Sequence, residues 1–310
     1  MKALLYETYG GPEVLHVAER PIPELRPGDA LVRVHAATVG LGDCKIRAGL
    51  LQHFFRVTLP NIPGRYGSGE VAAVGTDAST IGVGDAVVFA ALPAESGSAA
   101  EYVRVLAEKT ALKPRDLGHV ETASLIQGAT CAYICLVEVG QVASGHRVLI
   151  HGAAGAVGSA CVELARHRGA AITVTCREID RDYVRSLGAD RVLAFDREDF
   201  AACVRDQDVV IDLLGGDVHR RSYGVLRRGG RLVYLNASPF ENRGAEFGVA
   251  VLNAVIDNRG TVLDAVCRLA ERGVFAPKVG TVLPFADGVA AHRLVEAGAI
   301  KRGRVVLRII

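Results

Sequence analysis

A turn of small residues between an apolar run and a helix-like run is the part of this sequence that points most directly to chemistry. The apolar run is Val148–Ile150, and every residue from Gly152 to Ala156 is glycine or alanine. A strand, a tight turn and a helix start can hold a pyrophosphate, because backbone N–H groups and the helix dipole favour negative charge there. The residues that we expect to bind a dinucleotide are Gly152, Ala153, Ala154, Gly155, Ala156, Val157 and Gly158.

The glycine spacing departs from the usual dinucleotide fingerprint. Ala153 stands where the first glycine of G-x-G-x-x-G would be, and the three glycines follow G-x-x-G-x-x-G instead. Judged by the glycine spacing alone, the segment could also be a tight turn that binds no ligand. The position of the loop after a strand, before a helix and inside a longer alternating series favours dinucleotide binding.

The elements around this loop predict a doubly wound parallel sheet. Strand-like runs at 171–175, 191–195, 208–214 and 231–235 alternate with helix-like runs at 180–187, 198–204 and 218–226. Such alternation indicates parallel strands joined by crossover helices, with ligands at the carboxyl ends of the strands. Asn236 and Ala237 follow the last of these strands, and we therefore expect them to face the nicotinamide of a bound dinucleotide.

The first part of the chain has a different character. Turns rich in glycine and proline separate β-type runs such as 30–35, 70–75 and 86–90, and the tail after residue 278 returns to this character. We therefore expect residues 1–120 with 248–310 to form a mostly β domain, and residues 121–247 to form the doubly wound domain.

The composition limits the class of protein. The 310 residues are 50% hydrophobic and 23% charged with a net charge of +2, which is typical of an α/β protein of two domains and gives no strong field for nucleic acid. No signal peptide and no apolar run long enough to span a bilayer is evident, so we expect a cytoplasmic protein without membrane contact. The seven cysteines contain no C-x-x-C pair, which predicts reduced, buried thiols.

Several motifs together resemble the medium-chain dehydrogenase/reductase superfamily. They are Tyr9–Leu15, the turn at 26–34, the loop at 151–158, Ser186–Asp190 and 226–233. Within that superfamily the chain is most similar to the zinc-independent quinone oxidoreductase branch. The resemblance implies a GroES-like, mostly β catalytic domain, a Rossmann domain, NADPH as hydride donor and a homodimer.

The positions of the metal ligands in zinc-dependent relatives imply that this chain binds no zinc. Those relatives carry a Cys where this chain has Gly40, and a Gly-His-Glu where it has Gly64-Arg65-Tyr66. The connection 93–102 contains no Cys, so the structural zinc lobe is missing as well. The histidines are not spaced as a ligand set.

The end of the strand 171–175 bears on the choice between NADPH and NADH. Cys176 and Arg177 close this strand, and Arg181 follows one helical turn later. A cation here accepts a 2′-phosphate, whereas an acidic residue binds the free ribose hydroxyls. Arg177 therefore favours NADPH, and the nearby Glu178 and Asp180 keep NADH as the less favoured alternative.

Another nicotinamide contact is implied by the resemblance, with an ambiguity of one position. Relatives have a Thr near the nicotinamide in the segment that corresponds to 127–133. Thr130 matches when the segment is read from its start, and Cys131 takes its place when it is read back from the glycine loop. Both assignments stay open.

The stretch 40–49 corresponds to the substrate-pocket motif of the family, although its Asn and its aromatic residue are replaced. Asp43 and Lys45 remain candidate catalytic residues, with a turn-capping Asp and a solvated Lys as the alternatives. Tyr66 is a third candidate, since its phenol could bond the substrate or the cofactor, and a structural Tyr is the alternative.

The reaction that we expect is hydride transfer from NADPH to a quinone-like acceptor. A quinone spreads the developing charge over its own oxygens, so neither zinc nor a strong general acid is needed. A 2-alkenal or enone acceptor is the alternative, and it would draw more on Tyr66 or Lys45. An alternative from another class is a non-catalytic NADPH-binding sensor or interaction protein.

Overall fold

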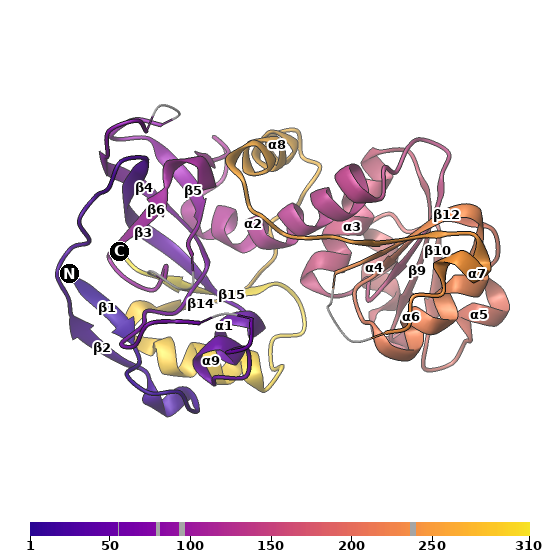
Figure 1. Cartoon of the computed structure of the whole chain (residues 1–310), viewed down its shortest axis with the longest axis horizontal. Helices are drawn as coiled ribbons and strands as arrows, with labels where there is room; N and C mark the ends of the chain where they lie inside the picture. The colour runs from indigo at the N-terminus through magenta and orange to yellow at the C-terminus, as the bar shows by residue number, and fades with distance from the viewer. Residues whose placement is uncertain (55, 79–80, 93–96, 236–239) are drawn as a thin grey trace. The chain divides into compact units, whose positions relative to one another are not determined.

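The computed structural model in Figure 1 describes the whole chain except residues 55, 79–80, 93–96 and 236–239. The chain divides into two compact units, unit 1 with residues 1–127 and 258–310, and unit 2 with residues 128–257. The sequence placed these boundaries after residues 120 and 247. Strand β13 (Ala250–Asn253) lies in unit 2 because it pairs in parallel with β12 (Leu226–Tyr234). Asn236 and Ala237, the expected nicotinamide contacts, lie outside the described residues.

Unit 1 is built on a seven-stranded sheet with the order β14-β15-β3-β4-β5-β7, in which β6 also pairs with β3. A separate two-stranded sheet is formed by β1 and β2. Buried aliphatic residues alternate along the central strand β3, which places it at the core of the unit. The elements of unit 1 are β1 Lys2–Leu5, β2 His16–Glu19, β3 Asp29–Val39, α1 Leu41–Arg47, β4 Tyr66–Val74, β5 Ala86–Ala90, β6 Tyr102–Leu106, β7 Thr110–Leu112, α8 Gly260–Glu271, β14 Val279–Pro284, α9 Gly288–Glu296 and β15 Arg304–Arg308.

The C-terminal tail completes this sheet. Strand β15 pairs antiparallel with β3 between Ala36 and Val39, and Val305–Leu307 are buried. Strand β14 pairs in parallel on the other side of β15, so the last two strands of the chain extend the seven-stranded sheet beyond β3. The prediction that the tail rejoins the first part of the chain is thereby confirmed.

Unit 2 is a six-stranded parallel sheet with the order β10-β9-β8-β11-β12-β13. The middle strands β8, β9 and β11 are almost entirely buried, as expected when helices cover both faces of a parallel sheet. This confirms the predicted doubly wound fold. The remaining elements of unit 2 are the π-helical turn Ile134–Val139, β8 Arg147–His151, α3 Ala156–His167, β9 Ala171–Cys176, α4 Arg181–Ser186, β10 Arg191–Ala194, α5 Phe200–Cys203, β11 Gln207–Asp212, α6 Gly216–Ser222 and α7 Gly244–Phe247.

One helix corrects an expectation from the sequence. Helix α2 (His119–Tyr133) continues into the π-helical turn, and the resulting segment His119–Val139 is long and apolar enough to cross a membrane by length and composition. From the sequence, no apolar run of this length was expected. Within the most apolar window of the segment 72% is buried inside the protein, as in the core helix of a folded domain.

The seven cysteines are all free thiols. Six of them are buried, and Cys203 at the end of α5 is exposed. Burial raises the pKa of the Cys44 thiol to about 12 and that of Cys176 to about 11. The prediction of reduced thiols is met, and the prediction of burial holds for all but Cys203.

Candidate functional site

The glycine loop of unit 2 forms the sharp turn from β8 to α3. Gly152 directly follows the last residue of β8 and has a φ of +76°, a conformation that favours glycine. The Ala153 N–H donates to the Thr175 carbonyl at 3.1 Å, which ties the loop to the end of β9. Gly155 is the N-cap of α3, so the helix begins directly at the loop.

Gly158 allows the helix to approach the turn. A Cβ at this position would lie 2.2 Å from the Gly152 carbonyl oxygen and 2.7 Å from the Ala153 Cα. A Cβ at Gly155, in contrast, would meet only the Gly152 oxygen at 3.4 Å. The first backbone bond of α3 runs from Ser159 N–H to Gly155 O, so the N–H groups of residues 156–158 have no acceptor within the helix. The loop therefore offers several unpaired N–H donors at the start of α3, with no side chain in front of them. A pyrophosphate requires such an arrangement.

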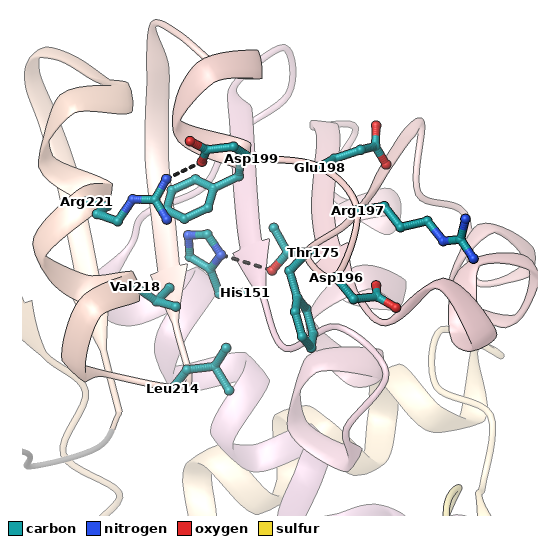
Figure 2. Close-up of a pocket in the computed structure, with 11 residues that line it drawn as sticks. His151, Thr175, Asp196, Arg197, Glu198, Asp199, Leu214, Val218 and Arg221 are labelled. Atoms are coloured by element: carbon teal, nitrogen blue, oxygen red, sulfur yellow. Dashed lines mark hydrogen bonds and ion pairs between the residues drawn. The ribbon is translucent and has the colours of Figure 1, made fainter.

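A pocket of about 570 Å³ lies at the carboxyl ends of four strands of the same sheet. Figure 2 shows its walls, which are formed by residues at the carboxyl ends of β8 and β9, in the segments that follow β10 and β11, and on α6. The lining residues are His151, Thr175, Phe195, Asp196, Arg197, Glu198, Asp199, Phe200, Leu214, Val218 and Arg221. The volume lies within the range of small-molecule sites, and the position is that of nucleotides in doubly wound sheets.

His151 forms the buried floor of this pocket. The Ser222 hydroxyl donates to the Val218 carbonyl, so it accepts from His151 Nε2–H at 3.1 Å. His151 Nδ1 is then the acceptor of the Thr175 hydroxyl proton at 3.0 Å, the contact drawn in Figure 2. Burial lowers the pKa of His151 to about 4, and Asp212 opposes this only in part. The ring is therefore a neutral element that fixes Thr175.

The two arginines predicted at the cofactor ribose lie in different surroundings. Arg181 donates to Glu198 at 2.6 Å and to Glu178 at 2.9 Å, and these contacts raise its pKa. Arg177 is exposed, and its guanidinium forms no hydrogen bond or ion pair with the residues that the structure describes, although its backbone carbonyl accepts from the Asp180 N–H at 2.9 Å. The loops after β9 and β10 are joined nearby, because the Glu178 N–H donates to Asp196 Oδ1 at 3.0 Å. Of the two arginines, Arg177 is the one available to a ligand.

Thr130 and Cys131 are both buried on α2. The Thr130 side chain is 0% exposed, and its hydroxyl has no hydrogen-bond partner among the described residues. A buried hydroxyl without a partner costs free energy that a bound ligand can recover. Both side chains are almost closed to solvent, so the choice between Thr130 and Cys131 as the nicotinamide contact stays a prediction.

The candidate catalytic residues of unit 1 do not form one cluster. Tyr66 at the start of β4 is 2% exposed, and its hydroxyl donates to Asn258 Oδ1 at 3.0 Å. Lys45 is exposed on α1. Asp43, on the same helix, accepts from the Gly40 N–H at 2.8 Å, as a turn-capping Asp would.

Asp43 lies in a strongly desolvating environment. Desolvation raises the pKa of its carboxyl to about 6, against the opposing effects of the Gly40 hydrogen bond and of the positive charges of Arg65 and Arg304. It lines a cavity of about 10 Å³ together with Tyr6 and Asn61, which leaves room for about one water molecule. Neither Lys45 nor Tyr66 lines this cavity. The structure thus gives Asp43 a perturbed acidity that the sequence did not show.

Sequence reasoning missed a buried polar network at the end of β11. Asp212 is 0% exposed and accepts from the Leu214 and Gly215 N–H groups at 2.9 and 2.8 Å. Its other oxygen accepts from His219 Nδ1 at 2.8 Å, and His219 Nε2 lies 3.2 Å from the Tyr223 hydroxyl. The network holds the turn that presents Leu214 to the pocket. The available signal was an aspartate inside an otherwise apolar strand run.

No group of three or more His, Cys, Asp or Glu side chains that could hold a metal ion occurs in the described part of the chain. Gly40, Arg65 and Tyr66 stand at the places where zinc-dependent relatives have ligands, and neither Gly nor Arg supplies a usual zinc ligand. The donor set expected for a catalytic zinc is therefore not present at these three positions.

Comparison with known proteins gives matches over the whole chain. Residues 26–144 match the family described as alcohol dehydrogenase GroES-like domain, and residues 187–307 match the family described as zinc-binding dehydrogenase. The NADPH-dependent alkenal/one oxidoreductase of Arabidopsis thaliana chloroplasts is 31% identical, over 92% of this chain and 73% of that protein. The mitochondrial NAD(P)H oxidoreductase RTN4IP1 of Danio rerio is 28% identical, over 100% and 92%.

Among solved structures, the quinone oxidoreductase from Coxiella burnetii superimposes with a TM-score of 0.88 at 28% identity, covering 100% of this chain and 99% of that one. The motifs, the paired GroES-like and Rossmann-type units and these matches agree. The chain belongs to the medium-chain dehydrogenase/reductase superfamily, on its quinone oxidoreductase-like branch.

Proposed function

We propose that this protein is an NADPH-dependent oxidoreductase that reduces a quinone. The observation that carries the proposal is the glycine loop, where Gly158 lets α3 reach the turn after β8 and where N–H donors converge on open space. The dinucleotide supplies the hydride. The protein residues bind and orient it, as relatives named oxidoreductases of NAD(P)H, quinones and alkenals also suggest.

Different residues of unit 2 would bind the different parts of the dinucleotide. The N–H groups at the start of α3 would hold the pyrophosphate, and the pocket of Figure 2 would take the adenosine half. In that pocket the ring of Phe195 is 53% exposed and Leu214 is 49% exposed, so both offer apolar surface to a base. The unpartnered hydroxyl of Thr130 fits an amide N–H donor such as the one on a nicotinamide.

The preference for NADPH rests on Arg177. It is the exposed cation at the end of β9 and has no carboxylate partner in the described structure, so its guanidinium can pair with a 2′-phosphate. Arg181 is held by Glu178 and Glu198 and contributes positive charge only at a distance. Reduction with NADPH should therefore be favoured over reduction with NADH.

A 2-alkenal or enone is the second candidate acceptor, and Asp43 favours it. Addition of hydride to an activated alkene leaves a carbanion or enolate that must take up a proton. A carboxyl with a pKa of about 6 holds a proton in roughly a tenth of the molecules at pH 7, far more than an ordinary aspartate does. A quinone makes no such demand, because solvent can protonate its oxygens.

The discriminating experiment measures NADPH and NADH oxidation with ortho- and para-quinones and with short and long 2-alkenals. Turnover of quinones alone supports the first candidate, and efficient reduction of 2-alkenals that falls in Asp43→Asn supports the second. Dinucleotide binding without either reaction would refute both and would favour a sensor or interaction protein.

Three further properties belong to the same proposal. Reaction without zinc is supported by Gly40, Arg65 and Tyr66 at the ligand positions, and activity should persist after treatment with a chelator. A cytoplasmic location is supported by seven free thiols, which are typical of a reducing compartment. A homodimer is supported by β13, an edge strand that in the described structure pairs only with β12, and light scattering would test it.

A further inference from the structure

We propose that unit 2 contains a second anion site, which binds a phosphate monoester. The site lies at the amino ends of the parallel strands, opposite to the glycine loop at their carboxyl ends. A cavity of about 250 Å³ lies there. Three arginines line it, together with Gln207 and Asp190. The three arginines are Arg147, Arg191 and Arg205.

The cavity is separate from the dinucleotide site. Arg147, Arg191 and Gln207 are the first residues of β8, β10 and β11, whereas the glycine loop and the pocket of Figure 2 lie at the ends of these strands. Strand β8 has five residues and therefore spans about 16 Å. The two cavities share no lining residue. A dinucleotide bound at the glycine loop would leave the second cavity open.

The three guanidinium groups contact backbone carbonyls and lack carboxylate partners. Arg147 Nη2 donates to the Arg205 carbonyl at 3.0 Å, and Arg191 Nη1 donates to the Cys203 carbonyl at 2.9 Å. Arg205 Nη1 donates to the Val204 carbonyl at 2.6 Å. Within the described residues none of the three forms an ion pair. A carbonyl orients a guanidinium without neutralising its charge, so the lining of the cavity carries an excess of positive charge.

The nearby carboxylates are already engaged. Asp208 accepts from Arg227 Nε at 2.6 Å and from the Arg147 backbone N–H at 2.8 Å. Asp190 accepts from the Ile172 N–H at 2.7 Å. The cavity lining thus holds three cationic side chains against the single carboxylate of Asp190, and an anion would be attracted there.

Gln207 gives an independent indication of a ligand. Its side chain is 3% exposed, and its Nε2 donates to the Arg205 carbonyl at 2.9 Å. Exchange of the amide atoms would place Oε1 against that carbonyl, so the assignment of Nε2 is fixed by the contact. Its Oε1 is buried and has no donor among the described residues. A ligand hydroxyl that donates to this oxygen would remove the cost of the unsatisfied acceptor.

The two indications together define the ligand chemistry. The arginines require an anion with several acceptor oxygens, and Gln207 requires a hydroxyl donor. A phosphate monoester that carries a hydroxyl, such as a sugar phosphate, offers both. The cavity volume is below that of drug-sized sites and suits a ligand of this size.

The test is calorimetric titration with ribose 5-phosphate, inorganic phosphate and neutral ribose at constant ionic strength. It is done with and without saturating NADPH, so that occupation of the glycine loop is distinguished from the second site. We expect ribose 5-phosphate to bind equally in both conditions and neutral ribose not to bind. Arg191→Met and Arg205→Met should each weaken binding at least about 10-fold, which is the loss of one charge-assisted contact.

Arg185→Met is the matched control, because Arg185 is an exposed arginine of α4 in the same unit and does not line the cavity. This variant should bind ribose 5-phosphate with the same affinity as the unchanged protein. The proposal is overturned if no phosphate compound binds, if NADPH abolishes the binding, or if Arg185→Met weakens it as much as Arg191→Met does. These outcomes do not depend on whether the protein reduces quinones. Thermal unfolding of each variant shows whether a loss reflects the site or the fold.

Discussion

Replacement of Gly158 by alanine tests the packing on which the dinucleotide loop depends. The added Cβ would lie 2.2 Å from the Gly152 oxygen and 2.7 Å from the Ala153 Cα, both of which are backbone atoms. Relief of the shorter contact requires a separation of about 1.2 Å between α3 and the turn, since ordinary contacts of a Cβ begin at 3.4 Å. Overpacking of this kind costs about 1–3 kcal/mol. We expect Gly158→Ala to lower both the free energy of unfolding and the affinity for NADPH.

Gly155→Ala is the matched control for this prediction. Its Cβ would meet only the Gly152 oxygen at 3.4 Å, and its φ of −72° suits alanine. The methyl group would enter the space in front of the helix start, so NADPH affinity should fall about 10-fold while stability stays within about 0.5 kcal/mol. Denaturant titration and fluorescence titration with NADPH measure the two quantities. If Gly158→Ala is as stable as the unchanged protein, or if Gly155→Ala is the less stable variant, the assignment of the two roles is wrong.

Three further predictions concern charge. Arg177→Ala should raise the KM for NADPH about 10-fold or more and hardly change that for NADH, because a charge-assisted contact to the 2′-phosphate is lost. The fold holds His151 neutral with a pKa of about 4, so the free energy of unfolding should decrease as pH falls from 6.5 to 4, by up to about 1.4 kcal/mol per pH unit for this group. Glu296→Gln should destabilise unit 1 by about 2 kcal/mol, because Arg47 is 1% exposed and loses its carboxylate partner.

Each of these predictions has a control and an opposing outcome. Equal effects of Arg177→Ala on both cofactors would exclude the 2′-phosphate assignment. The pH dependence of urea denaturation should become shallower in His151→Phe, and an unchanged slope would show that other groups cause it. Asp217→Asn removes the carboxylate of a pair with Arg220 in which both side chains are more than half exposed, and should cost less than about 0.5 kcal/mol. A similar loss in Asp217→Asn and Glu296→Gln would contradict the argument from burial.

The sequence predicted those features that local pattern determines. The alternation of apolar strands and helical runs after Gly152 gave the parallel sheet, because period and burial follow directly from neighbouring residues. The turn residues of the glycine loop were found for the same reason. The boundary near residue 257 was placed too early, since only pairing with β12 shows that β13 belongs to the parallel sheet.

The partners of the candidate site's side chains could not be predicted from local sequence patterns, because they come from distant parts of the chain. The partner of Tyr66 is Asn258, 192 residues away, and no spacing rule connects the two. Arg181 is held by Glu198, which is brought near only by the pairing of β9 with β10. The acidity of Asp43 depends on desolvation by residues from several segments, which composition and periodicity do not report.

The exposure of Cys203 makes selective chemical labelling of this protein possible. The other six thiols are buried, and burial raises the pKa of Cys44, Cys176 and Cys267 to about 11 or 12, so these three form little thiolate near neutral pH. A maleimide or a fluorinated alkylating reagent should therefore modify the natural chain at one position without any substitution. Because Cys203 lines the cavity of the three arginines, a probe attached there would report occupation of that cavity directly, by fluorescence or by ¹⁹F NMR.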